Sequence, residues 1–258
     1  MAEERQTKYT IGEIYELPSK GLVYDKPVNP VIELRSMNGR DELKRQNPNT
    51  PSTQFKLLAD IIEGCCIEKP AVHVYDMCLA DYTFLLHKLR VITYENGYDV
   101  KLICPFCNEP IETVVDLDSL PYNEFDIDKY KELSILNLPK SGHTISLKLQ
   151  TPRMLDENSA KAKDMKRRYK TSDVSFDMLV VLLSIIDTVD GEKLDQSKLE
   201  TFIYSLPALD LKLIIKREDE LNASFGIVND LTVDCNHCGG EVHTSFRYGA
   251  EFFGPASR

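Results

Sequence analysis

The spacing of apolar residues along the chain predicts six helices. Apolar side chains recur at intervals of three or four residues in most of these segments, and proline, serine or glycine marks many of their ends. The expected helices start at Thr50 and Pro51 with apolar positions to Cys65, run from about Asp81 to Asn96-Gly97, from Pro152 to Tyr169, from Ser175 to Asp187, from a capping box at Ser197 and Glu200 to Pro207, and from Pro207 to just before Gly226.

Short extended runs predict strands between these helices. Val31 to Leu34 and Ile145 to Leu149 are extended and mainly apolar, and Val100 to Ile103 leads into a cysteine pair. Beyond that pair, apolar and polar residues alternate from Ile111 to Val115, as in a strand with one buried face. The pattern therefore predicts an α+β fold that is mostly helical.

The second part of the chain echoes the first part in the same order. The segment Leu17-Pro18-Ser19-Lys20-Gly21 matches Leu138-Pro139-Lys140-Ser141-Gly142, and the separation of later matches drifts only by loop-sized amounts. The later matches are Asp41-Glu42 with Asp156-Glu157, Phe55 with Phe176, and Leu79-Ala80-Asp81 with Ala208-Leu209-Asp210. The period is too long for a solenoid, so we expect two pseudo-duplicated halves.

This duplication predicts five segments. They are an N-terminal arm (1–16), a first half with a first zinc knuckle (17–120), a linker (121–137), a second half with a second zinc knuckle (138–246) and an aromatic C-terminal tail (247–258). Phe252 and Phe253 in the tail are expected either to pack against the core or to bind a partner.

Two cysteine pairs carry the strongest chemical signal. Cys104 and Cys107 flank Pro105-Phe106, and Cys235 and Cys238 flank Asn236-His237. A C-x-x-C turn points two thiolates at one ion, and zinc prefers four tetrahedral sulfur or nitrogen ligands. The equivalent knuckles are expected to meet and share one structural Zn²⁺ per chain in a zinc-ribbon-like site that joins the halves. The alternative is a set of buried thiols without metal.

A thiol redox centre is a further alternative for the first pair. A C-P-x-C sequence after an apolar strand resembles the centre of glutaredoxins, where a following helix lowers the pKa of the first cysteine. Here Pro110 and the alternating residues after it predict a strand in place of that helix. The sequence therefore favours a metal knuckle.

Composition and charge narrow the possible partners. The chain has 258 residues, 42% of them hydrophobic, and a formal net charge of −10, which repels a nucleic-acid backbone. Its longest apolar run, from Met178 to Ile186, is too short to cross a bilayer, and the polar residues after Met1 do not resemble a secretory signal. Seven cysteines with two C-x-x-C pairs suit a reducing compartment. We expect synthesis in the cytoplasm, no membrane association and no nucleic-acid partner.

Catalytic motifs are missing from the sequence. None of the five histidines lies in a nucleophile or metallohydrolase motif, and no glycine-rich phosphate loop occurs. A zinc closed by four thiolates also has no open position for a reacting water. The sequence therefore predicts a binding or assembly protein and not an enzyme.

The combination of motifs resembles a known family. Leu17-Pro18-Ser19-Lys20-Gly21-Leu22-Val23-Tyr24, then Asp81, Leu89-Arg90 and the Cys104–Cys107 knuckle, are similar to the baseplate hub subunits and hub-assembly proteins of T-even-type contractile-tailed phages, over roughly residues 14 to 160. The resemblance implies a structural or assembly component of the tail baseplate hub, located in the virion after assembly in the host cytoplasm. Its implied partners are other hub and tail proteins, with the tape-measure protein as a further candidate.

Two other classes of function stay open from the sequence. A zinc-ribbon adaptor for nucleic acid or transcription machinery would use the same four cysteines. A thiol oxidoreductase would use one C-x-x-C pair for redox chemistry.

Overall fold

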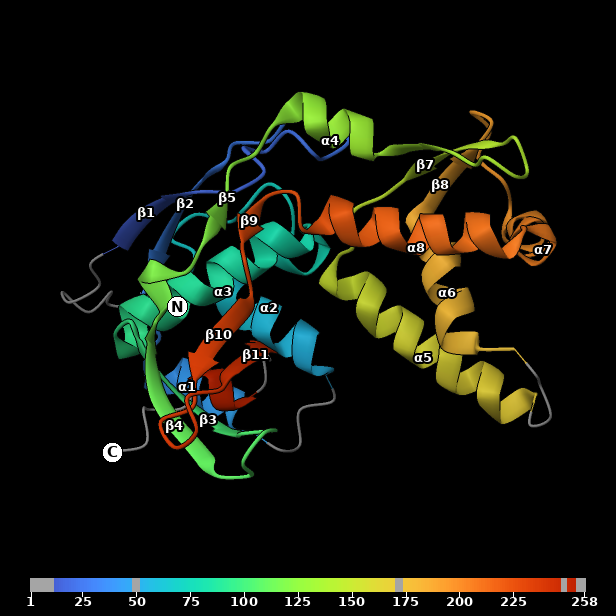
Figure 1. Ribbon diagram of the computed structural model, residues 1–258. Coiled ribbons are helices and arrows are strands. Elements are labelled where there is room, and N and C mark those ends of the chain that lie inside the picture. Colours follow the sequence, from blue (N-terminus) through green and yellow to red (C-terminus); the bar gives the residue numbers. More distant parts are fainter. Residues whose placement is uncertain (1–11, 48–51, 170–173, 247–249, 254–258) are drawn as a thin grey trace.

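The computed structural model shows two lobes joined side by side (Figure 1). It describes residues 12–47, 52–169, 174–246 and 250–253. The fold is mixed α and β, with eight α-helices and several small antiparallel sheets in these ranges. We call residues 12–125 together with 226–253 the first lobe and residues 126–225 the second lobe, because the two largest apolar cores fall almost entirely within these divisions.

The first lobe is built from both ends of the chain. Its central helix, α3 (Leu79–Tyr94), buries Tyr82, Leu85 and Leu89. Around α3 lie β1 (Gly12–Glu16), β2 (Val31–Arg35), α1 (Gly39–Arg45), α2 (Gln54–Cys65), β3 (Gly97–Ile103), β4 (Pro110–Asp116), β5 (Tyr122–Asn123), β9 (Gly226–Ile227), β10 (Asp230–Asp234), β11 (Glu241–Ser245) and the 3-10 helices η1 (Val74–Asp76), η2 (Leu117–Ser119) and η3 (Ala250–Phe253).

The second lobe packs helices around a three-stranded antiparallel sheet in the order β6-β7-β8. Helix α6 carries apolar residues on all sides, and a helix of this kind is expected in the interior of the lobe. Its residues Leu179, Leu182 and Ile185 are buried. The elements are α4 (Ile127–Leu133), β6 (Ile135–Asn137), β7 (Thr144–Leu147), α5 (Pro152–Arg168), α6 (Phe176–Ile185), β8 (Ile186–Val189), α7 (Gln196–Ser205) and α8 (Ala208–Asn222).

The six expected helices are present, with corrections at their ends. Helix α2 begins at Gln54 after the N-cap Thr53, and the expected start at Thr50 and Pro51 lies outside the described residues. The helix expected to reach Asp187 ends at Ile185, because the next residues pair with β7 as strand β8. The capping box at Ser197 was wrong, since Asp195 is the N-cap of α7 and accepts from the Lys198 N–H at 2.9 Å.

The last strands return to the first lobe. Leu231, Phe246, Phe252 and Phe253 pack in the same core as α2 and α3. The buried Arg90 side chain secures this return, because its Nε donates to the Phe252 carbonyl oxygen at 2.9 Å. The observed lobes therefore do not coincide with the expected halves, although each lobe contains one of the two Leu-Pro turns.

The two Leu-Pro turns are each held by an aspartate near the start of a distant helix. In the first turn, the Ser19 N–H and hydroxyl donate to the Asp81 carboxylate at 2.9 and 2.5 Å. In the second turn, the N–H groups of Lys140 and Ser141 donate to Asp210 at 3.1 and 2.7 Å. Each aspartate is the third residue of its helix, α3 or α8, and neither is exposed to solvent.

Candidate metal centre

Two β-ribbons carry the four candidate cysteine ligands. Strands β3 and β4 pair from Gly97 with Asp116 to Ile103 with Pro110, and β10 and β11 pair from Asp230 with Ser245 to Asp234 with Glu241. The ribbons meet through a small apolar cluster that consists of Cys104, Ile111, Val233, Cys235 and Val242. Ile111, Val233 and Val242 reach this cluster from strands β4, β10 and β11, and Cys104 and Cys235 directly follow β3 and β10.

The two knuckles have the same backbone hydrogen bonds. In the first knuckle, the Asn108 N–H donates to the Cys104 carbonyl oxygen, and the Cys104 N–H donates to the Glu109 carbonyl oxygen, both at 2.9 Å. In the second, the Gly239 N–H donates to the Cys235 carbonyl oxygen at 2.8 Å and the Cys235 N–H donates to the Gly240 carbonyl oxygen at 2.9 Å. Asn108 and Gly239 occupy equivalent positions, with φ of 62° and 69°, a region that favours glycine and asparagine.

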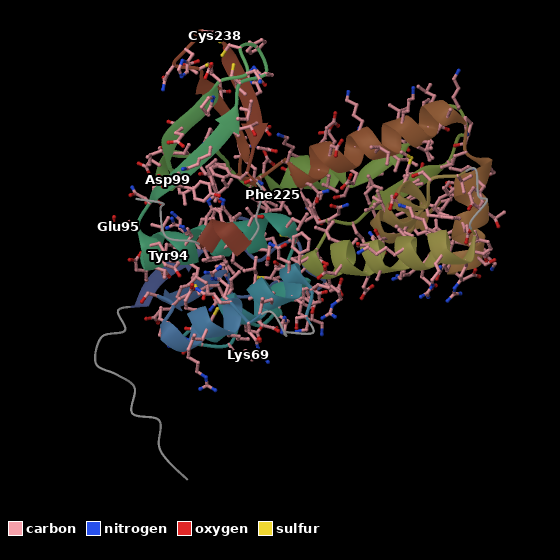
Figure 2. All side chains as sticks on the ribbon, turned by 90° about the horizontal axis from the view of Figure 1, so that it is seen from below. Lys69, Tyr94, Glu95, Asp99, Phe225 and Cys238 are labelled. Carbon is pink, nitrogen blue, oxygen red and sulfur yellow. The ribbon has the colours of Figure 1, made fainter. Side chains whose placement is uncertain are left out.

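The knuckles bring the four thiols to one point, at the outer end of the ribbons where Cys238 is labelled (Figure 2). The Cys104 and Cys238 Sγ atoms are 3.7 Å apart, and those of Cys107 and Cys235 are 3.6 Å apart. All four Sγ atoms lie within 4.8 Å of one another. Four sulfurs at a Zn–S distance of about 2.3 Å form a tetrahedron with edges of about 3.8 Å. The arrangement fits a tetrahedral zinc, and it is too wide for disulfides, whose S–S bond is about 2.05 Å.

A comparison with known protein families finds one that matches nearly the whole chain. The model of the family described as T4 bacteriophage base plate protein matches residues 11–254, which include both lobes and both ribbons. The chain belongs to this family. The resemblance to T-even-type baseplate proteins is thereby confirmed, and the base plate family suggests a structural protein of the phage tail without enzymatic activity. No curated protein and no solved structure matches the chain.

In this base plate protein, the environment of Cys235 favours its thiolate. The backbone N–H groups of Cys238 and His237 lower the pKa of the Cys235 thiol to about 6. Thiolates are the form in which cysteine binds zinc. The residues after the first pair form strand β4, as expected, so the helix that activates a thiol redox centre is missing there.

The other three cysteines of the base plate protein lie outside the four-thiol cluster. Cys65 is buried in the first core, as its helical position predicts, and burial raises its pKa to about 12. Burial likewise raises the pKa of Cys66 to about 12, and that of Cys78 well above its usual value. Neutral thiols of this kind pack as small apolar groups.

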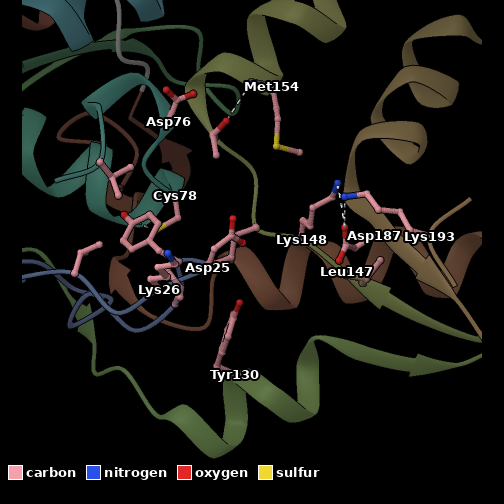
Figure 3. Close-up of a pocket in the computed structure, with 16 residues that line it drawn as sticks. Asp25, Lys26, Asp76, Cys78, Tyr130, Leu147, Lys148, Met154, Asp187 and Lys193 are labelled. Atoms are coloured by element: carbon pink, nitrogen blue, oxygen red, sulfur yellow. Dashed lines mark hydrogen bonds and ion pairs between the residues drawn. The ribbon is translucent and has the colours of Figure 1, made fainter. Parts of the chain in front are cut away.

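A cleft of about 830 Å³ lies between the two lobes (Figure 3). Lys148 and Lys193 both approach the Asp187 carboxylate, with Nζ–Oδ1 distances of 3.4 and 3.8 Å. Tyr130 and Asp25 face the cleft from separate segments. The sequence patterns did not single out these residues, since they come together only through the packing of the lobes, and their charges are largely balanced.

Within the described ranges, every helix is either too short or too polar to span a bilayer.

Proposed function

We propose that this base plate protein is a structural or assembly component of the tail baseplate hub, stabilised by one zinc held by Cys104, Cys107, Cys235 and Cys238. The observation that carries the proposal is the convergence of four thiols from ribbons far apart in a chain of the base plate family. A metal bound only in the folded state can contribute on the order of 10 kcal/mol to the stability of small zinc modules. A closed four-thiolate site supplies this stability without catalysis.

The proposed partners are other hub and tail proteins, with the tape-measure protein as a further candidate. Membership of the base plate family supports partners within the tail. The first ribbon also exposes large apolar side chains, with Ile103 62% exposed and Phe106 68% exposed. Exposed apolar groups of this kind support protein contacts. We place the protein in the tail baseplate of the virion after assembly in the host cytoplasm.

The zinc is tested by metal analysis of the purified full-length protein. We expect about one zinc per chain, as the closed four-thiolate site requires. The Cys104→Ser and Cys235→Ser variants should each lose it, because either change opens the shared tetrahedron. Cys66→Ser is the matched control and should keep the zinc. Two zinc ions per chain, lost independently in the two variants, would contradict a shared site.

The hub position is tested in isolated tails. A peptide-tagged copy of the protein should be labelled by antibody at the centre of the baseplate, and mass spectrometry should detect it in baseplate precursors. Antibody label at the periphery of the baseplate would contradict the proposed position in the hub. Detection in precursors but not in finished virions would identify an assembly factor that leaves.

We also propose that the two regions with Leu-Pro turns and cysteine knuckles arose by internal duplication. Support comes from the matching knuckles and from the aspartate at the third position of α3 and of α8, which holds each turn. Superposition of residues 17–116 on residues 138–245 tests the duplication. A different spatial order of the matched helices would contradict it.

A further inference from the structure

A second inter-lobe cleft, of about 470 Å³, is lined by acidic groups alone among its charged residues. Glu218 and Asp219 contribute from α8, and Asp230 from the start of β10. Phe55 of α2 and Phe225, which is labelled at the junction of the lobes in Figure 2, supply aromatic surface. The cleft therefore combines negative charge with aromatic rings.

Glu218 is the unusual member of this group. Its side chain is only 7% exposed, and no ion pair joins it to any described residue. Its Oε1 accepts a hydrogen bond from Asn222 Nδ2 at 2.6 Å. Arg217, the preceding residue in the sequence, donates instead to the carbonyl oxygens of Glu132 and Ile135. A buried carboxylate without a cationic partner is costly, and burial together with Asp219 raises the pKa of Glu218 to about 7.

Tyr82 is a second unusual polar residue of this cleft. Its side chain is 1% exposed and lines the same cleft, and its hydroxyl has no hydrogen bond within the described part of the chain. Buried polar groups normally have partners, so an unpaired buried hydroxyl together with a buried carboxylate that lacks a cationic partner indicates a binding site at this cleft. A metal ion does not suit this cleft. Among the described residues, only the four cysteines bring three or more potential metal-ligand atoms close together.

We propose that this cleft receives an arginine side chain of a neighbouring protein, with its guanidinium group on the Glu218 carboxylate. Arginine suits the cleft because its planar fork pairs with a carboxylate through two hydrogen bonds and its face stacks on aromatic rings. The three acidic residues, with no basic residue beside them in the lining, make the cleft complementary to such a cation. Only the identity of the neighbour, another tail protein, rests on the proposed function.

Occupation of this cleft would also fix the two lobes relative to each other. Glu218 belongs to the second lobe, whereas Phe55 and Tyr82 belong to the first. A side chain that contacts both sides couples the lobe junction to partner binding. The cleft thus offers a way to hold the protein in one conformation within an assembly.

The test is an NMR titration of the full-length protein with arginine methyl ester. We expect saturable shifts at the Glu218 carboxylate and at the ring of Phe225. Citrulline methyl ester, which has the same shape without the charge on its side chain, should give no saturable shifts. Glu218→Gln should weaken binding about tenfold, because a charged pair is replaced by a neutral contact. Glu220→Gln on the exposed side of the same helix should bind like the original protein.

A second variant and a change of pH complete the test. Asp219→Asn at the exposed edge of the cleft should weaken binding about twofold to threefold, as expected for a partly screened charge. Binding should strengthen from pH 6 to pH 8 as Glu218 ionises beside Asp219, Asp230 and Tyr82, the other titratable groups that line the cleft. Equal binding of both esters, or undiminished binding by folded Glu218→Gln, would overturn the inference. Neither result would change the family or the zinc proposal.

Discussion

Single carboxylates hold together segments that lie far apart in the sequence. Asp81 accepts hydrogen bonds from the Ser19 N–H, the Ser19 hydroxyl and the Tyr24 hydroxyl, the last at 2.6 Å. Burial raises the pKa of Asp81, while the hydrogen bonds from Ser19 and Tyr24 oppose that rise. The N-terminal Leu-Pro turn therefore depends on one buried side chain.

We predict that Asp81→Ala destabilises the protein by about 3 kcal/mol, because it leaves two hydroxyl donors and one amide donor without their buried acceptor. Denaturant unfolding of the zinc-loaded protein measures the change. Asp128→Ala is the control, since Asp128 is also in the first turn of a helix but is exposed. It should cost less than about 1 kcal/mol. Equal losses in the two variants would show that helix charge, and not the turn, accounts for the role of Asp81.

At the scale of elements, two very short strands join the lobes. Strand β5 pairs with β9 through Tyr122 with Ile227 and Asn123 with Gly226. The chain leaves the first lobe just after β5 and re-enters it at β9, so this pairing closes the base of the second lobe. Gly226 has φ +91°, and a Cβ atom there would lie 3.0 Å from the Ala80 Cβ at the start of α3. Both the backbone conformation and the close approach to α3 require glycine.

Gly226→Ala should therefore destabilise the protein by about 2 to 3 kcal/mol, the sum of an unfavourable positive φ and a steric overlap with α3. Gly142→Ala is the matched control, because Gly142 has φ +79° but a Cβ atom added there would meet no atom within 4 Å. It should cost only about 1 kcal/mol. Thermal unfolding of both variants measures the difference, and equal losses would mean that the contact between β9 and α3 adapts without cost.

At the scale of the whole molecule, the proposed metal site takes no part in the apolar core of the second lobe. The apolar core of the second lobe contains none of the four clustered cysteines, whereas the ribbons rely on a small cluster of their own. A core this small cannot offset the entropy of ordering two ribbons without additional links. The proposed zinc supplies such a link for the first lobe.

We therefore predict that chelation loosens the ribbons before the second lobe. After EDTA treatment, limited trypsin digestion should first cut near Lys101 in β3, while the segment from α5 to α8 persists as a larger fragment. Mass spectrometry of the fragments over time measures the order of cleavage. The untreated protein and the Cys66→Ser variant provide controls, and simultaneous loss of both lobes would show that they unfold as one unit.

Local signals in the sequence were sufficient for most of the helices and for the knuckles. The bounds of α5 and α8 follow from proline starts and apolar spacing, and the turns of both knuckles follow from their C-x-x-C spacing. Local signals predicted the wrong helix end where pairing with a distant strand determined the conformation of a segment. Ile186 continues an apolar helical run, yet it leaves α6 because Leu147 of β7 pairs with it.

The sequence alone determined the four cysteines, the matching Leu-Pro turns and the resemblance to the base plate family, because each is a short local pattern. Only the tertiary structure decided that the second ribbon returns to the first lobe, that Asp81 and Asp210 hold the two turns, and that Glu218 lies buried without a cation. These features depend on contacts between residues far apart in the chain. Such contacts follow from how the lobes pack, and no local spacing encodes them.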